Sequence, residues 1–251
     1  MNFRSMSCGG IKASFCTAVL ALLMVSTGFA GEHDCGPLKN FNDFGPFDYQ
    51  APENRVSTGA DPMGRIKRVE NVHFQDEMKL INLKQFSIDR LSGEFTYTLR
   101  IFPNHPEALH ALSKLERVAG GKLPQTALTV FTPKISADCF FDRAIRFRPE
   151  DKAVHLVYGM HLHQRRNFKE ALVAYEKAEA LGEESTYLSY NLGLLHTDLK
   201  NWEKAAAYAR KAYGKGATFP GLRERIEKAG YTVPLVGHSE AELSVDSPSA
   251  N

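Results

Sequence analysis

Four histidines are the residues whose type would best suit metal binding. His155, His161 and His163 lie close together, and His196 follows in a later segment. Neutral imidazole nitrogens are ligands for zinc and other transition metals. On a regular helix, however, His161 and His163 would point about 200° apart, and only His155 and His163 share a face, some distance from each other. We therefore predict no metal site and no cofactor.

Other catalytic signatures are missing from the sequence. It contains no Gly-rich phosphate loop, no His-Glu-x-x-His pair and no Gly-x-Ser-x-Gly turn. The paired acids Glu183 and Glu184 lie at the end of an expected helix, where solvation is more typical than the apolar pocket that a catalytic acid requires. Cys139 is better explained by a disulfide than by nucleophilic catalysis. The sequence predicts no catalytic residue and no enzyme activity.

The first 30 residues have the pattern of an export signal. Arg4 and Lys12 precede an apolar stretch at 18–25, and small residues around Ala30 suit cleavage before Gly31. An uncleaved membrane anchor is the alternative, but the run is far shorter than the roughly 20 residues that a spanning helix needs. We expect no integral membrane span after cleavage and a periplasmic or secreted protein.

Removal of the signal changes the charge and the cysteine content. Arg4 and Lys12 are lost, so the 31 basic residues fall by two to equal the 29 acidic ones. A neutral chain has no general attraction to nucleic acid, and we expect no nucleic-acid partner. Of the four cysteines, Cys35 and Cys139 remain. In an oxidising compartment they should form a disulfide, contributing roughly 3 to 5 kcal/mol; two separate buried thiols are the alternative.

The chain contains an internal repeat with a period of 34 residues. Residues 152–185 superimpose on residues 186–219. In each copy an asparagine precedes an aromatic residue and is a candidate N-cap for the second helix. The matching positions include Gly159 with Gly193, Asn167 with Asn201, Phe168 with Trp202, and Ala171 with Ala205.

This pattern resembles the tetratricopeptide-repeat (TPR) family, in which small and aromatic residues let two antiparallel helices cross closely. The sequence departs from the family at Tyr158, which replaces a leucine, and at Ala209, which replaces an aromatic residue. The resemblance implies an all-α fold, a right-handed superhelical stack of antiparallel helix pairs.

The predicted order of segments follows from the repeat and from changes in composition. One expected segment is an insertion near 120–133, which is either a functional loop or a surface loop that has no role. The segments are a signal peptide at 1–30, an irregular arm at 31–70, an irregular N-terminal helical unit at 71–105 with a candidate helix at 75–83, three TPR-like units at 106–219 with an insertion near 120–133, a capping helix at 220–230 and a disordered tail at 237–251.

The resemblance also implies a binding surface. In proteins similar to this family, the first helix of each unit lines a concave groove that binds a segment of a partner protein. Tyrosine and methionine would supply adaptable contacts, and Lys114 and Arg117 could bind an acidic group. The groove residues that the repeat assigns are His110, Lys114, Arg117, Met160, His163, Gln164, Tyr187, Tyr190, Asn191 and Asp198.

The resulting function is a protein-interaction module with a protein or peptide partner. Two alternatives stay open: an accessory structural subunit of a cell-envelope export or assembly complex, and an enzyme of unrecognised type. The groove could also be filled by the arm or by the inserted loop, which would make the protein a self-contained subunit.

Overall fold

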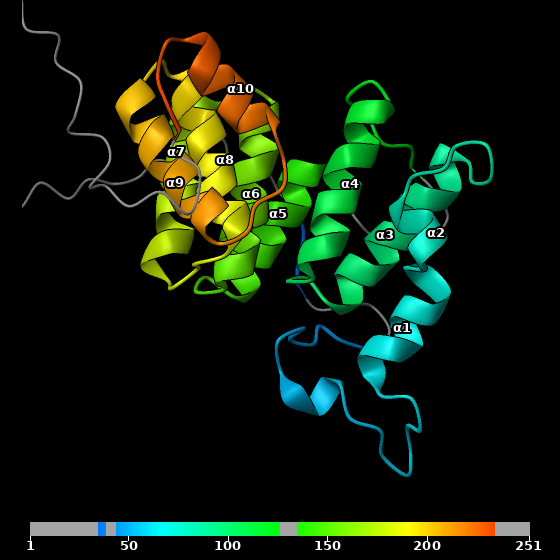
Figure 1. The fold of residues 1–251 in the computed structure, drawn as a ribbon. Coiled ribbons are helices and arrows are strands. Elements are labelled where there is room, and N and C mark those ends of the chain that lie inside the picture. Colours follow the sequence, from blue (N-terminus) through cyan, green and yellow to red (C-terminus); the bar gives the residue numbers. More distant parts are fainter. Residues whose placement is uncertain (1–34, 39–43, 126–134, 234–251) are drawn as a thin grey trace, which may run out of the picture. The chain divides into compact units, whose positions relative to one another are not determined.

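The computed structural model describes residues 35–38, 44–125 and 135–233, and is all-helical over those ranges (Figure 1). The predicted signal peptide, the inner part of the insertion and the predicted tail lie outside the described residues. Within the described ranges the only β-type pairing is an isolated bridge between Thr58 and Asp61. The elements are η1 (Pro52–Asn54), α1 (Arg65–His73), α2 (Asp76–Lys79), α3 (Ile88–Ile101), α4 (Pro106–Val118), α5 (Ala137–Phe147), α6 (Lys152–Gln164), α7 (Phe168–Ala180), α8 (Thr186–Asp198), α9 (Trp202–Gly214) and α10 (Gly221–Lys228).

The helices pack as consecutive pairs. Helix α6 packs along α7 and α8 packs along α9, while the first helices α4, α6 and α8 contact one another in turn. Helices α6 and α8 begin 34 residues apart, as do α7 and α9. The predicted stack of helix pairs is confirmed, and its superhelical sense stays a prediction. No helix in the described part of the chain has the length and apolar character needed to cross a membrane.

The turns within the two repeated pairs differ from the expectation. Asn167 and Asn201 occupy the N-cap positions of α7 and α9, but neither side chain makes a capping hydrogen bond. Instead, the backbone N–H of Asn167 donates to Leu162 O at 2.9 Å, and that of Asn201 donates to His196 O at 2.8 Å. The turn is so short that the asparagine before the second helix is only three residues beyond the end of the first. Its backbone closes the first helix in a Schellman-type bond.

Gly159 leaves room for an aromatic ring of the paired helix. A Cβ at Gly159 would lie 2.4 Å from Tyr175 Cδ1, so the ring of this fully buried tyrosine occupies the space that a side chain would fill. In the next pair the residue matching Tyr175 is Ala209. There a Cβ at Gly193 would lie 2.5 Å from Leu222 Cδ2. Leu222 of α10 therefore fills the volume that the smaller alanine leaves open.

The N-terminal arm is more ordered than expected. Helix α1 begins at Arg65, within the segment predicted to be irregular, and α2 is only four residues long where a helix over 75–83 was predicted. Cys35 and Cys139 form a disulfide that joins the arm to α5. Beside it, Arg143 donates to the carbonyl oxygen of Pro37, and Arg146 donates to that of Gly36 at 3.1 Å.

A buried asparagine fixes the next part of the arm. Asn104 Nδ2 donates to Asp48 Oδ1 at 2.7 Å and to Asp151 Oδ2 at 2.8 Å, and its Oδ1 accepts from the backbone N–H of Tyr49 at 2.9 Å. Asp151 is also the N-cap of α6. Since every polar atom of the amide is used, Asn104 aligns the arm, the end of α3 and the start of α6 together.

The packing at Gly159 gives a stability prediction. We expect Gly159→Ala to lower the free energy of unfolding by about 1 to 3 kcal/mol, because the added Cβ overlaps a buried ring that cannot move away. Gly193→Ala is the matched comparison. It should cost less, because the side-chain end of Leu222 can shift, and chemical denaturation of both variants measures the difference. Equal costs for the two substitutions would contradict this account.

Candidate partner-binding groove

The candidate groove is built from the first helices of successive units. Because α4 contacts α6 and α6 contacts α8, equivalent positions on these helices share one face. Helix α10 packs against α8 and continues the row. Residues that are 34 positions apart in the sequence are therefore neighbours in space, and this brings predicted groove residues from different units together.

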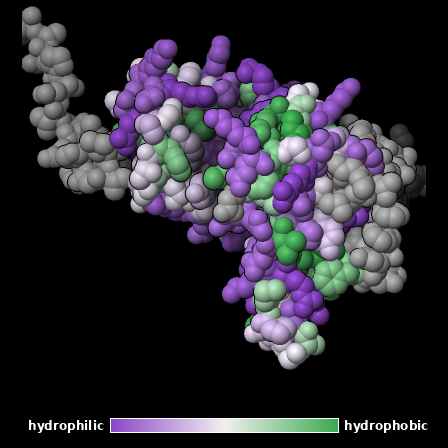
Figure 2. Space-filling model, turned by 90° about the vertical axis from the view of Figure 1, so that its right-hand side faces the viewer, coloured by the Kyte–Doolittle hydropathy of each residue, from purple (hydrophilic) through white to green (hydrophobic). Residues whose placement is uncertain are grey.

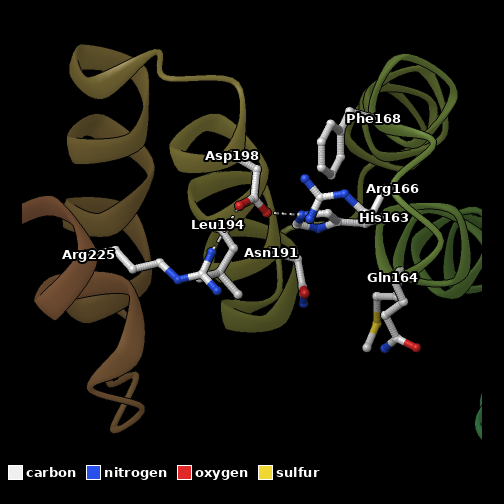
Figure 3. A pocket seen from close by; sticks show the side chains of 9 residues that line it. His163, Gln164, Arg166, Phe168, Asn191, Leu194, Asp198 and Arg225 are labelled. Carbon is white, nitrogen blue, oxygen red and sulfur yellow. Dashed lines mark hydrogen bonds and ion pairs between the residues drawn. The ribbon is translucent and has the colours of Figure 1, made fainter.

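A cavity of about 270 Å³ opens on this face between α6, α8 and α10 (Figure 3). Five of the predicted groove residues line it: Met160, His163, Gln164, Asn191 and Asp198. The other lining residues are Arg166, Phe168, Leu194 and Arg225.

Asp198 links the two sides of this cavity. Its Oδ2 is 2.8 Å from His163 Nε2 on α6, and its Oδ1 accepts from Arg225 Nη1 of α10 at 3.2 Å. Figure 3 shows Asp198 between these two side chains. Arg166 lies in the turn after α6, where its guanidinium carbon is 5.2 Å from the centre of the Phe168 ring. The carboxylate is shared between two partners, and Arg166 is held by a cation–π contact.

Four lining residues are absent from the predicted groove set, and three of them lie outside the first helices of the units. Phe168 reads as a core aromatic because it matches Trp202, and Arg166 falls in a turn outside the first helices. Arg225 lies in the predicted capping helix. It follows the predicted groove residue Asn191 by 34 positions, so extending the repeat period into that helix would have identified it.

The predicted groove residues of α4 lie outside the cavity. Arg117 Nη1 donates to Gln164 Oε1 of α6 at 3.1 Å, which connects the α4 face to the cavity wall. Lys114 and His110 are on the same helix and are half-buried. Burial lowers the pKa of His110, and the nearby positive charges of Lys114 and Arg117 lower it further. This part of the face is therefore cationic while His110 stays neutral.

The two predicted groove tyrosines also lie outside the cavity lining. Tyr187 is 58% exposed, and its ring centre is 6.2 Å from that of Phe219. Tyr190 packs 5.3 Å from the same ring and contacts the core shared by α8, α9 and α10. The tyrosines thus form an aromatic surface with Phe219, which is itself 43% exposed. Phe219 is the last residue of the second repeat copy and lies in the connection before α10, outside the first helices used for the prediction.

Two of the predicted metal-ligand candidates outside the cavity, His161 and His155, have hydrogen-bonding partners in the fold. His161 is buried between Ser113 Oγ, 2.8 Å from its Nδ1, and Asp138 Oδ1, 2.9 Å from its Nε2. These residue types also form catalytic triads, but Ser113 is only 6% exposed, so we assign the set to joining α4, α5 and α6. His155 Nε2 lies 2.8 Å from Pro149 O. Among the described residues, no three His, Cys, Asp or Glu side chains are grouped to hold a metal ion.

Comparisons with known proteins add little to this geometry. No protein-family description matches the chain, and no curated protein matches it. One similar solved structure is the crystal structure of a thermophilic TPR protein from Thermus thermophilus. It is 19% identical with a TM-score of 0.37, and the match covers 61% of this chain and 95% of that one. Similarity at this level carries no argument, so the fold rests on the helix contacts described above.

Buried histidines give a prediction for the pH dependence of stability. Burial lowers the pKa values of His105, His110 and His196, although the hydrogen bond that His105 donates to Glu70 partly opposes the shift at His105. The unfolded chain therefore binds more protons than the folded chain once the pH falls below about 6.5. We expect the Tm to fall between pH 7.5 and pH 5.5 in thermal unfolding. His110→Gln should reduce the slope, and a Tm that rises over this range would contradict the assignment.

Proposed function

We propose that this protein is an exported protein-interaction module that binds a segment of a partner protein across the face formed by α4, α6 and α8. The observation that carries the proposal is the cavity on this face, because it gathers five predicted groove residues from two repeat units. The proposed module requires no cofactor, and its activity is binding and not catalysis.

The described part of the arm does not occupy this cavity. Its contacts reach α5 through Cys35, the end of α3 through Phe47, and Asn104 through Asp48. None of them involves a residue that lines the cavity. These contacts favour a segment of another protein, and not the arm of this chain, as the occupant of the cavity. The central residues of the inserted loop lie outside the described residues.

A second candidate function is supported by the opposite end of the stack. Leu80 is 74% exposed, and Val72 and Leu83 are also exposed on the segments around α1 and α2. Figure 2 views this side of the molecule and shows hydrophobic areas among hydrophilic ones. Terminal units of helical repeats usually present polar outer faces. The apolar residues favour an accessory subunit of a cell-envelope complex that docks through this end.

Site-specific photo-crosslinking tests the groove proposal. A benzophenone amino acid at Tyr187 should crosslink a partner in cell-envelope extracts, because this side chain is exposed beside the groove. The same amino acid at Val173, which is 66% exposed on α7, is the matched control and should not crosslink that partner. Crosslinks from Leu80 alone would favour the accessory-subunit function, and equal crosslinking from Tyr187 and Val173 would contradict groove binding.

Export has a separate test. N-terminal sequencing of the protein recovered from the periplasm or medium should begin at Gly31, because the small residues before it suit cleavage. The same material should show no thiol that reacts with a maleimide under denaturing conditions, since Cys35 and Cys139 are disulfide-bonded. Full-length protein retained in the cytoplasm would contradict this part of the proposal.

A further inference from the structure

We propose that the groove selects an acidic partner segment, and that the cavity between α6, α8 and α10 receives a carboxylate side chain of that segment through Arg166 and Arg225. This inference rests on the proposed function and specifies the chemistry of the partner. It concerns an internal aspartate or glutamate side chain, and the free carboxyl terminus of a partner is a different ligand.

The first argument is the balance of charge on this face. The cavity is lined by two guanidinium groups, those of Arg166 and Arg225, and by a single carboxylate, that of Asp198. Asp198 is already shared between Arg225 and His163. The cavity therefore has an excess of positive charge, which a ligand carboxylate would neutralise.

The excess of positive charge continues on α4. The one described polar contact of Arg117 is with the uncharged amide of Gln164, at 3.1 Å. Among the described residues Lys114 has no carboxylate within ion-pair distance, whereas Lys79 is paired with Glu107 at 3.2 Å. A partner segment that runs from the cavity toward α4 would meet cations along its path. Complementary charge of this kind speeds encounter and selects between partners.

The second argument is the way Arg166 is held. Its φ of +64° is a left-handed conformation that side chains other than glycine rarely adopt. The side chain is exposed, and the contact with the Phe168 ring keeps its guanidinium beside the cavity. Among the described residues Arg166 has no acidic partner within ion-pair distance. A planar guanidinium held in this way can donate two parallel hydrogen bonds to a carboxylate.

The third argument is the apolar part of the lining. Met160 and Leu194 are half-buried and contact the hydrophobic cores of the stack while also lining the cavity. They provide a surface for the methylene groups of a glutamate or for an apolar neighbour in the segment. Burial of the ligand against them would lower the local dielectric constant and strengthen the interaction with the arginines.

The repeat itself supplies a control for Arg166. Lys200 is the equivalent residue 34 positions later, and its φ of +59° is also left-handed. It is exposed, basic and on the corresponding turn, but it does not line the cavity. Glycine is favoured in this backbone conformation, so Arg166→Gly and Lys200→Gly should both leave the protein folded. Only Arg166→Gly should remove a ligand contact.

The test uses synthetic peptides and isothermal titration calorimetry. The acidic probe is a twelve-residue peptide of glutamate, leucine and alanine, acetylated at its N-terminus and amidated at its C-terminus. The comparison peptide has glutamine in place of every glutamate. We expect the acidic peptide to bind at least about tenfold more tightly, and Arg166→Gly and Arg225→Gln each to weaken it about tenfold. Lys200→Gly should leave the affinity unchanged, and raising the salt concentration should weaken binding.

Several outcomes would overturn the inference. These are equal binding of the two peptides, no binding of the acidic peptide, equal losses from Arg166→Gly and Lys200→Gly, or binding that requires a free C-terminal carboxylate. An acidic polysaccharide such as polygalacturonate that binds as tightly as the peptide would indicate a general polyanion site and would also overturn it.

The inference and the proposed function can fail separately. If a partner crosslinks at Tyr187 but its binding is unchanged in Arg166→Gly and insensitive to salt, the groove binds a partner and the acidic selection is wrong. If the acidic peptide binds through Arg166 while Tyr187 and Val173 crosslink partners equally, the anion site stands and the groove proposal fails.

Discussion

The close packing of α6 and α8 against their neighbours depends on two positions that have no side chain. Gly159 accepts the ring of Tyr175 from its own pair, and Gly193 accepts Leu222 from α10. The space beside the glycine is therefore filled by a different side chain in each pair. The second solution draws α10 onto α8, and this brings Arg225 to the edge of the cavity. The composition of the candidate site is thus a consequence of how the core is filled in the last pair.

Much of the fold could be predicted because its main determinants are local and periodic. A period of 34 residues, marked by small and aromatic positions, fixed the places of α6 to α9. The departures occur where the determinants are not local. Tyr49, Asn104 and Asp151 are far apart in the sequence, and only the folded chain shows that they form one hydrogen-bonded set. Helix α1 lacks a repeat partner and begins after a glycine with no side-chain cap, so its start gave no usable signal.

The candidate site was predicted in part for the same reason. Residues on the first helices follow the repeat, so Met160, His163, Asn191 and Asp198 were found together. Arg166 and Phe219 lie on connections between helices, where the period assigns no role. The tyrosines show that a position in the repeat does not by itself determine which side chains line the cavity. Tyr190 also packs into the core, and Tyr187 lies beside Phe219 instead of in the cavity. Sequence position specified the face, and local packing decided which side chains meet there.

The long-range tie between the arm and α5 also affects how the molecule would respond to mechanical tension. Most helix contacts join near neighbours along the chain, but the disulfide closes a loop with a sequence separation of 104 residues. A force applied at the two ends would bypass that loop and act on the helices that follow it. Reduction of the bond would release roughly 350 Å of additional contour length at about 3.4 Å per residue. The Cys35–Cys139 crosslink thus divides the helical array into a segment shielded from extension and a segment that bears the load.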